Sequence, residues 1–385
     1  MTWNFYYDRK HWTKPRMKAF LEGVEGDKLL SLDYFCDNVE LWRRNDSYFG
    51  KPFIWCYLGN FGGNTMLHGN MHDVADKLGK VVVEGGSNLT GIGGTLEGLD
   101  CNPVMHEMVL AKAWAPQMTA NEWATVWARS RGGDKAPKIV EAWQLLADSV
   151  YVGRTTTGSS SLTNARPALD KKNGSYTSPA YKFKDANLRK ALDLLLAAEG
   201  ADDNTAYQFD VMNLTRQLLG NEFNHTRDRF TAAYKAGDVS AARAHAARMD
   251  SIITGLDRLL ATDPQFSLAT WIADARSFGT DAADSDRYEL NARTLLSVWG
   301  YTDKKLNDYA NRQWSGLLSG FYGQRWHMFT DAVIKAMEAG TVFDEAATTA
   351  AIKEWEGTWA ASKEPVTPVS SENPVTVARE VLKML

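Results

Sequence analysis

The stretch Pro52–Asn64, PFIWCYLGNFGGN, joins a short apolar run to a loop of glycine and asparagine. Its first part, Pro52–Leu58, is typical of a strand that is buried on both faces. Similar runs occur at Leu29–Asp33 and Asn88–Gly93, and the aromatic stretch Trp3–Tyr7 is a further candidate strand. Stretches of helical character lie between and after these runs, at 15–24, 66–78 and 103–114. Short apolar strands that alternate with helices predict a parallel sheet with covered faces.

The second part of the chain has a different composition, dominated by alanine and leucine. In the stretch 241–261, apolar residues recur with the period of a helix and form one face, namely Met249, Ile252, Ile253, Leu256, Leu259 and Leu260. The loop Gly153–Pro179, which is rich in Ser, Thr and Gly, is a candidate lining segment. We therefore predict an α/β part over residues 1–125 and an all-helical part over residues 126–385.

The bulk composition is that of an ordinary globular protein. The 385 residues carry a net charge of −4, which gives no electrostatic basis for a nucleic-acid partner or for an acidic membrane surface. No apolar run approaches the roughly 18–20 residues that span a bilayer. The 14 Trp, 14 Tyr and 15 Phe exceed what a core alone requires, so some aromatic rings are expected to contact a flat apolar ligand such as a sugar ring.

The sequence predicts no metal and no cofactor. The cysteines, Cys36, Cys56 and Cys101, are widely spaced and form neither a zinc motif nor a disulfide framework. His68 and His72 have the i, i+4 spacing of a helical metal site, but Gly69 stands where a metalloprotease helix has its glutamate, and a surface face is the favoured interpretation. Walker A and G-x-S-x-G motifs are absent from the sequence.

The stretch 91–103, GIGGTLEGLDCNP, contains the most informative carboxylate, Glu97. It is either a catalytic group held at the end of a strand or an ordinary loop residue. Capping of the helix that starts near Pro103 suits Asp100 and Asn102 better, since they directly precede it. A dinucleotide-binding loop is disfavoured, because a non-glycine residue stands at position 96, where that fingerprint requires a third glycine.

Other carboxylates and amides are weaker candidates. Asp33, at the end of a predicted strand, is a second candidate acid, although a structural acceptor is the favoured interpretation. Glu84 and Glu107 also lie in this part of the chain, and Glu107, about one helical turn beyond Pro103, fits a helix surface or a packing position. The loop around Asn60 and Phe61 offers amide groups and an aromatic ring of the kind that binds sugars, and equally fits a simple tight turn.

PFIWCYLGNFGGN and GIGGTLEGLDCNP together resemble the signature region of the α-N-acetylglucosaminidases, glycoside hydrolase family 89. Further matching stretches are AWQLLADSVY at 142–151, YELNAR at 288–293, LLSVWG at 295–300 and NDYANRQWSGLLSGFYGQRW at 307–326. The resemblance extends over essentially the whole chain from Trp3. It implies a partial (β/α)8 TIM-type barrel over residues 1–125, followed by a large all-helical C-terminal domain over residues 126–385.

The resemblance also implies an activity and its residues. Family members remove terminal α-linked N-acetylglucosamine with retention and use two glutamates. Glu97 falls on the nucleophile of the family, with Leu96 where the family usually has proline. The residues that fall on the substrate pocket are Trp3, Asn60, Phe61, Trp299 and Tyr309. The substrate implied is a glycan that ends in α-GlcNAc, and neither chemical step requires a metal.

The general acid of the family lies in the first half of the barrel, before the region that Trp3 matches. The chain is therefore expected to lack the general acid, and the missing N-terminal half of the enzyme is an expected partner. The alternative is a non-catalytic remnant that binds a carbohydrate or a partner protein through a helical module. Family members are lysosomal, periplasmic or secreted, and the first residues, MTWNFYYDRKHW, lack the apolar core of a signal peptide, so the compartment stays open.

Overall fold

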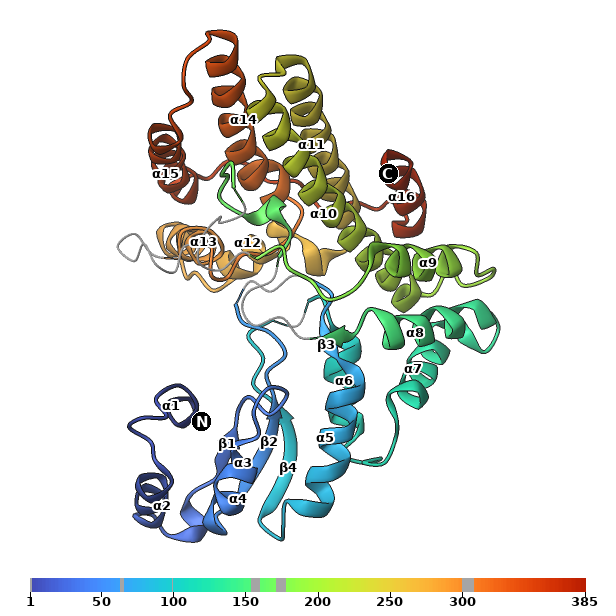
Figure 1. Cartoon of the computed structure of the whole chain (residues 1–385), viewed down its shortest axis with the longest axis vertical. Helices are drawn as coiled ribbons and strands as arrows, with labels where there is room; N and C mark the ends of the chain where they lie inside the picture. Colours follow the sequence, from blue (N-terminus) through green and yellow to red (C-terminus); the bar gives the residue numbers. More distant parts are fainter. Residues whose placement is uncertain (1, 63–65, 99, 154–159, 171–177, 300–307) are drawn as a thin grey trace.

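The computed structural model describes residues 2–62, 66–98, 100–153, 160–170, 178–299 and 308–385. Figure 1 shows a small sheet with its helices at one end of the molecule and a larger helical part at the other. One cluster of buried apolar side chains runs through both parts, from Phe53 and Trp55 of the sheet to Ile352 and Val377 of the last helices. Within the described ranges, no helix is both long enough and apolar enough to cross a membrane.

The sheet consists of three parallel strands in the order β1 (Ser31–Asp33), β2 (Phe53–Tyr57) and β4 (Leu89–Gly94). Ser31 pairs with Phe53, and the register of β2 and β4 runs from Phe53 with Leu89 to Tyr57 with Gly94, with one irregularity after Phe53. These strands confirm the prediction that the three apolar runs form a parallel sheet. Because the strands are parallel, their carboxyl ends lie at one edge of the sheet, where α/β proteins place their sites.

The aromatic stretch at the N-terminus is a helix, α1 (Trp3–Tyr7), so the prediction of a strand was wrong. Thr2 N–H donates to the Leu32 carbonyl at 3.1 Å, which brings the segment to the edge of β1. The chain then turns helical, and Tyr6 N–H donates back to the Thr2 carbonyl. Phe5 is thereby buried beside Trp12, with ring centroids 4.7 Å apart. Aromatic residues are enriched in strands, so tertiary packing here outweighs that preference.

Helices flank the sheet on both sides, as Figure 1 shows for α5 and α6 on one side and α1 and α2 on the other. Helix α5 begins at Met71, later than predicted, because Asn70 caps it by accepting from Asp73 N–H at 3.2 Å. The residues before it enter a short ribbon with the helical part. The elements of this region are α2 (Lys14–Glu22), η1 (Gly26–Lys28), α3 (Leu41–Arg44), α4 (Asp46–Phe49), β3 (Gly69–Asn70) with its partner β5 (Val152–Gly153), α5 (Met71–Glu84) and α6 (Pro103–Ala111).

The second part is helical in every long element, as predicted. Its first helix starts at Ala120, and the boundary between residues 125 and 126 stays a prediction. Its elements are α7 (Ala120–Ala128), η2 (Arg129–Gly133), α8 (Pro137–Ser149), η3 (Leu162–Asn164), α9 (Asp185–Leu196), α10 (Thr205–Ala236), α11 (Val239–Leu260), η4 (Pro264–Phe266), α12 (Leu268–Ser277), α13 (Ala282–Leu296), η5 (Leu318–Tyr322), α14 (Gly323–Glu338), α15 (Glu345–Ala361), α16 (Pro374–Val381) and η6 (Leu382–Met384).

Helix α10 is the central helix and buries polar as well as apolar side chains. Asn213 Nδ2 donates to the Cys101 carbonyl at 2.8 Å, and Gln217 Oε1 accepts from Leu67 N–H at 2.8 Å. Arg216 Nη1 donates to Gln313 Oε1 at 2.6 Å. The bonds of Asn213 and Gln217 fix the two parts of the chain against each other with a directionality that apolar contact lacks, and the bond of Arg216 lies within the helical part.

Asp33, the second candidate acid, ends β1 and is fully buried. Its Oδ2 accepts from Trp42 N–H at 2.8 Å. Burial raises the pKa of Asp33 from 3.8 to about 7, although hydrogen bonds from Trp42, Cys36 and Tyr48 oppose the rise. These contacts make Asp33 a structural acceptor at the end of the strand.

The apolar face of α11 yields a stability prediction. Leu256 is fully buried there, so Leu256→Ala leaves a cavity and should lower the free energy of unfolding by about 2–5 kcal/mol. Leu290 of α13 is 36% exposed, and Leu290→Ala should change it by no more than about 0.5 kcal/mol. Urea unfolding followed by circular dichroism measures both. Equal losses for the two variants would contradict the packing described.

Asp33 yields a pH prediction. Between about pH 4 and 7 the folded protein keeps a proton that the unfolded chain releases, because the pKa is raised on folding. The stabilisation from this group is therefore complete below about pH 4 and is lost as the pH rises through about 7. Asp33→Asn cannot titrate. The unfolding free energy of the wild type minus that of Asp33→Asn should fall by up to about 4 kcal/mol across this range. A difference that is flat with pH would refute the assignment.

Candidate active site

Glu97 lies in the loop after β4, at the carboxyl edge of the sheet. Its Oε2 accepts from Gly62 N–H at 2.7 Å and from the Tyr309 hydroxyl. Three segments that are distant in sequence thus meet at one carboxylate oxygen: the loop after β2, the loop after β4 and the segment 308–314 of the helical part. Burial raises the pKa of Tyr34 above its ordinary range, and the nearby charge of Glu97 adds a smaller rise.

Asn60 holds the loop that carries Glu97. Its Oδ1 accepts from Glu97 N–H at 3.3 Å and from Gly98 N–H at 3.2 Å, and its Nδ2 donates to the Gly98 carbonyl at 2.5 Å. The sequence left open whether the loop after β2 is a tight turn or a sugar-binding loop. The structure shows that the amide of Asn60 binds backbone, so its first role is to position Glu97.

Aromatic residues lie in or next to the segments that bind Glu97. Phe61 is half-buried and stands edge-on against Phe35, with ring centroids 5.3 Å apart. Trp299 contacts Tyr309 in the same manner, with centroids 5.1 Å apart. Trp3 lies in α1, and its side chain is outside the described part of the structure. Of the predicted site residues, Glu97, Asn60 and Tyr309 meet directly, Phe61 directly follows Asn60, and Trp299 contacts Tyr309.

Arg312 was not singled out from the sequence and is the most connected cation of the site. Its Nη1 donates to the Gly62 carbonyl at 2.5 Å, and its Nη2 donates to the Glu97 carbonyl at 3.2 Å. Its Nε lies 3.3 Å from Asp100 Oδ2. One guanidinium therefore joins both loops of the sheet, a geometry that its planar set of donors makes possible. The sequence did offer an indication of Arg312, because it lies in NDYANRQW, the start of a stretch that resembles the family.

Gly62 was noted only as part of a loop that fits a tight turn or a sugar-binding loop, but its lack of a side chain is required. Its φ is +32°, and a Cβ there would stand 2.8 Å from the ring of Tyr309 and still closer to the Tyr309 carbonyl oxygen. Glycine thus allows the backbone of the loop after β2 to lie directly against Tyr309, with its N–H directed at Glu97.

The expected capping roles of Asp100 and Asn102 are not what the structure shows. Asn102 stands at the N-cap of α6 without a side-chain cap, and it binds His68 N–H and the Met66 carbonyl instead. Asp100 Oδ2 accepts from Trp314 Nε1 at 3.1 Å. Tertiary contacts thus use side chains that local sequence assigned to the helix end.

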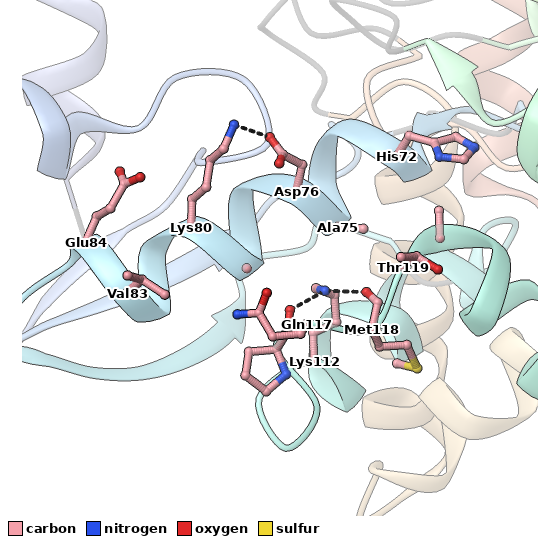
Figure 2. Close-up of a pocket in the computed structure, with 13 residues that line it drawn as sticks. His72, Ala75, Asp76, Lys80, Val83, Glu84, Lys112, Gln117, Met118 and Thr119 are labelled. Carbon is pink, nitrogen blue, oxygen red and sulfur yellow. Dashed lines mark hydrogen bonds and ion pairs between the residues drawn. The ribbon is translucent and has the colours of Figure 1, made fainter.

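The prediction of a surface face holds for His72 and is wrong for His68. His68 precedes α5 and is buried, whereas His72 is exposed and its Nε2 lies 2.9 Å from Asp148. His72 lines a hollow of about 440 Å³ between α5 and the segment 116–120, on the outer face of α5 (Figure 2). Its charged groups are engaged: Lys80 pairs with Asp76 at 2.6 Å, and Lys112 donates to two backbone carbonyls. This hollow shares no lining residue with the Glu97 site.

Comparison with known proteins identifies the architecture. A model of the α-N-acetylglucosaminidase TIM-barrel domain matches residues 1–116, and a model of the α-N-acetylglucosaminidase C-terminal domain matches residues 123–384. The human α-N-acetylglucosaminidase is 30% identical over 349 residues, which are 89% of this chain and 46% of the human protein. The chain thus spans about half the length of that relative.

Solved structures of a family 89 glycoside hydrolase from Clostridium perfringens are similar over most of the chain. The complex with 2-acetamido-1,2-dideoxynojirmycin has a TM-score of 0.86 and 26% identity, over 95% of this chain and 43% of that one. A variant with two glutamate-to-glutamine substitutions, in complex with its substrate GlcNAc-α-1,4-galactose, has a TM-score of 0.83 and 25% identity, over 92% and 41%. With both family models matched along the chain, this protein belongs to the α-N-acetylglucosaminidase family, glycoside hydrolase family 89, as part of a TIM-type barrel followed by the helical C-terminal domain.

Proposed function

We propose that this chain supplies the nucleophile and part of the sugar pocket of a retaining α-N-acetylglucosaminidase. The observation that carries the proposal is the position of Glu97 at the carboxyl edge of the sheet, held through Oε2 by Gly62 and Tyr309. Among the contacts of described residues, both donors bind Oε2. We therefore assign Oε1 as the oxygen that attacks the anomeric carbon.

The reaction has two displacements. Glu97 Oε1 forms a bond to the anomeric carbon while the glycosidic bond breaks, and the leaving oxygen takes a proton from a general acid. The same acid, now a base, then takes a proton from water, which attacks the anomeric carbon and releases Glu97 with net retention. Donors already placed around the carboxylate need no reorganisation during these steps.

The substrate in this proposal is a glycan that ends in α-linked GlcNAc. The Clostridium protein was solved with GlcNAc-α-1,4-galactose, which supports this class of substrate. In this chain, Phe61 lies in the loop whose Gly62 binds Glu97, Trp299 contacts Tyr309, and Trp3 completes the residues proposed for the pocket. Aromatic faces of this kind bind the apolar side of a sugar ring.

The general acid is proposed to come from a barrel segment outside this chain. The other carboxylate of the Glu97 loop, Asp100, is engaged with Trp314 and Arg312 and so serves as a structural acceptor. Among the described strands, β1 and β4 each pair with β2 only, and the Leu32 carbonyl of β1 already accepts from Thr2. The outer edge of β4 offers backbone groups to a further strand, so the N-terminal half of the enzyme is the partner that we propose.

A non-catalytic carbohydrate-binding protein is the second candidate. The aromatic residues Phe61 and Trp299 favour it, because aromatic rings can bind a sugar whether or not a general acid is present. The two functions differ in one observable: the binding protein retains GlcNAc without turnover, and the enzyme releases it.

Substitution of Glu97 tests the proposed role. With the complementary barrel segment supplied, Glu97→Gln should lower GlcNAc release from an aryl α-GlcNAc glycoside by at least about three orders of magnitude, the scale expected for loss of a nucleophile. Glu84→Gln, a matched change at an exposed helix end, should leave the rate unchanged. Azide added to Glu97→Ala should restore turnover and give the β-glycosyl azide, because azide then attacks from the face that Glu97 occupied.

The outcomes separate the candidates. An α-glycosyl azide, or full activity of Glu97→Gln, would refute Glu97 as the nucleophile. Binding of 2-acetamido-1,2-dideoxynojirmycin by the chain, with no GlcNAc release even when the complementary segment is present, would favour the binding protein.

Gly62 provides a second test of the site. Gly62→Ala should force Tyr309 away from Glu97, since the added methyl group collides with Tyr309, and GlcNAc release should fall by about 10²-fold, the typical effect of losing one donor at a reacting group. Gly357→Ala, in α15 where a Cβ meets nothing within 4 Å, is the matched control and should not lower the rate. Equal rates for Gly62→Ala and wild type would show that the contact of Tyr309 with this loop is dispensable.

A further inference from the structure

A buried network of four charged side chains lies behind Tyr309. Arg325 Nη2 donates to Asp308 Oδ1 at 2.8 Å, and its Nε lies 2.9 Å from Glu356 Oε1. Arg166 forms two bonds with Glu356, at 3.0 and 2.5 Å. Arg325, Asp308 and Glu356 are buried, with Arg325 fully enclosed. The two cations and two anions balance in charge.

Burial of such a network is costly, and apolar residues of similar volume often stabilise a fold as well or better. The position of the network next to Tyr309 points to a role other than stabilising the fold. Asp308 directly precedes Tyr309, and its φ of +64° lies in the left-handed region that non-glycine residues adopt at a cost. An unfavourable conformation of this kind persists where the surroundings fix it.

The backbone of Asp308 is fixed on both sides. Its N–H donates to the Ser297 carbonyl at 3.2 Å. Its carbonyl accepts from both the backbone N–H and the side-chain Nδ2 of Asn311, the latter at 2.7 Å. Asn311 is itself held by Asn164 Nδ2 at 2.8 Å. With the carboxylate bound to Arg325, the direction in which the chain leaves Asp308 toward Tyr309 is determined.

We propose that Asp308 and Arg325 are positioning residues for catalysis, which act through Tyr309 on Glu97. The ion pair holds Asp308 in its left-handed conformation, the conformation directs Tyr309 over Gly62, and the Tyr309 hydroxyl then binds Glu97 Oε2. The proposal rests on the proposed function only for its effect on turnover. Its structural part concerns the order of the Glu97 site and is measurable without activity.

The test uses Asp308→Asn, which keeps an acceptor oxygen and tolerates the left-handed conformation but removes the charge that binds Arg325. The matched control is Asp210→Asn. Asp210 also forms a buried pair with an arginine of the helical part, Arg131, at 2.8 Å. It therefore reproduces the loss of a buried ion pair without touching the segment of Tyr309.

Hydrogen–deuterium exchange of the whole chain is the first measurement. The amide of Gly62 donates to Glu97, so its exchange reports whether that carboxylate is held. Asp308→Asn should accelerate exchange of the peptide that carries Gly62 about tenfold, as Tyr309→Phe should, while Asp210→Asn should not. The double variant Asp308→Asn with Tyr309→Phe should exchange no faster than Tyr309→Phe alone, since both changes act by removing the same bond from Tyr309 to Glu97.

Equal exchange in Asp308→Asn and Asp210→Asn, or additive effects with Tyr309→Phe, would overturn the proposal. If Asp308→Asn does not fold, Arg325→Lys serves in its place: a single ammonium cannot span Asp308 and Glu356 as the guanidinium does, and the same acceleration is expected. In the complete enzyme, Asp308→Asn should lower kcat about tenfold with KM nearly unchanged. An inactive wild type would defeat the proposed function, and the exchange result would still decide this inference.

Discussion

Hydrogen bonds from the segment 308–314 to the loops after β2 and β4 are the constraint on which the site depends. Tyr309 binds the carboxylate of Glu97, Arg312 binds the carbonyls of Gly62 and Glu97, and Trp314 binds Asp100. The sheet alone places Glu97 at its carboxyl edge. The helical part then fixes where that carboxylate points, so the two parts of the chain form one site.

Hydrogen bonds also hold the interface between the two parts of the chain. Helix α10 directs Asn213, Arg216 and Gln217 at the backbone of the first part and at Gln313, where apolar side chains would have sufficed for burial alone. Apolar contact is tolerant of small displacements, whereas buried hydrogen bonds lose most of their energy when donor and acceptor separate. The proposed role of Glu97 requires placement to a fraction of an ångström, which polar contacts of this kind can provide.

Small residues complete the arrangement at the points of closest approach. Gly62 admits Tyr309, and a Cβ at Gly98 would stand 3.1 Å from Asn60 Nδ2 and 3.2 Å from Arg312 Nη2. Glycine in these loops therefore serves close packing of backbone against side chains, and the loops are held by their neighbours at both positions.

The sequence by itself determined the class of fold and the family, and it singled out Glu97 as the candidate carboxylate. The apolar runs that became β1, β2 and β4, the helical face around Leu256, and Glu97 within its motif are all local patterns, which the period of a strand or helix or a characteristic stretch reveals. Only the tertiary structure decided that Trp3–Tyr7 is a helix, that Asn102 binds residues 66 and 68 in place of its own helix, and that Arg312 joins both loops. Those outcomes depend on partners up to 250 positions away, which no local pattern encodes.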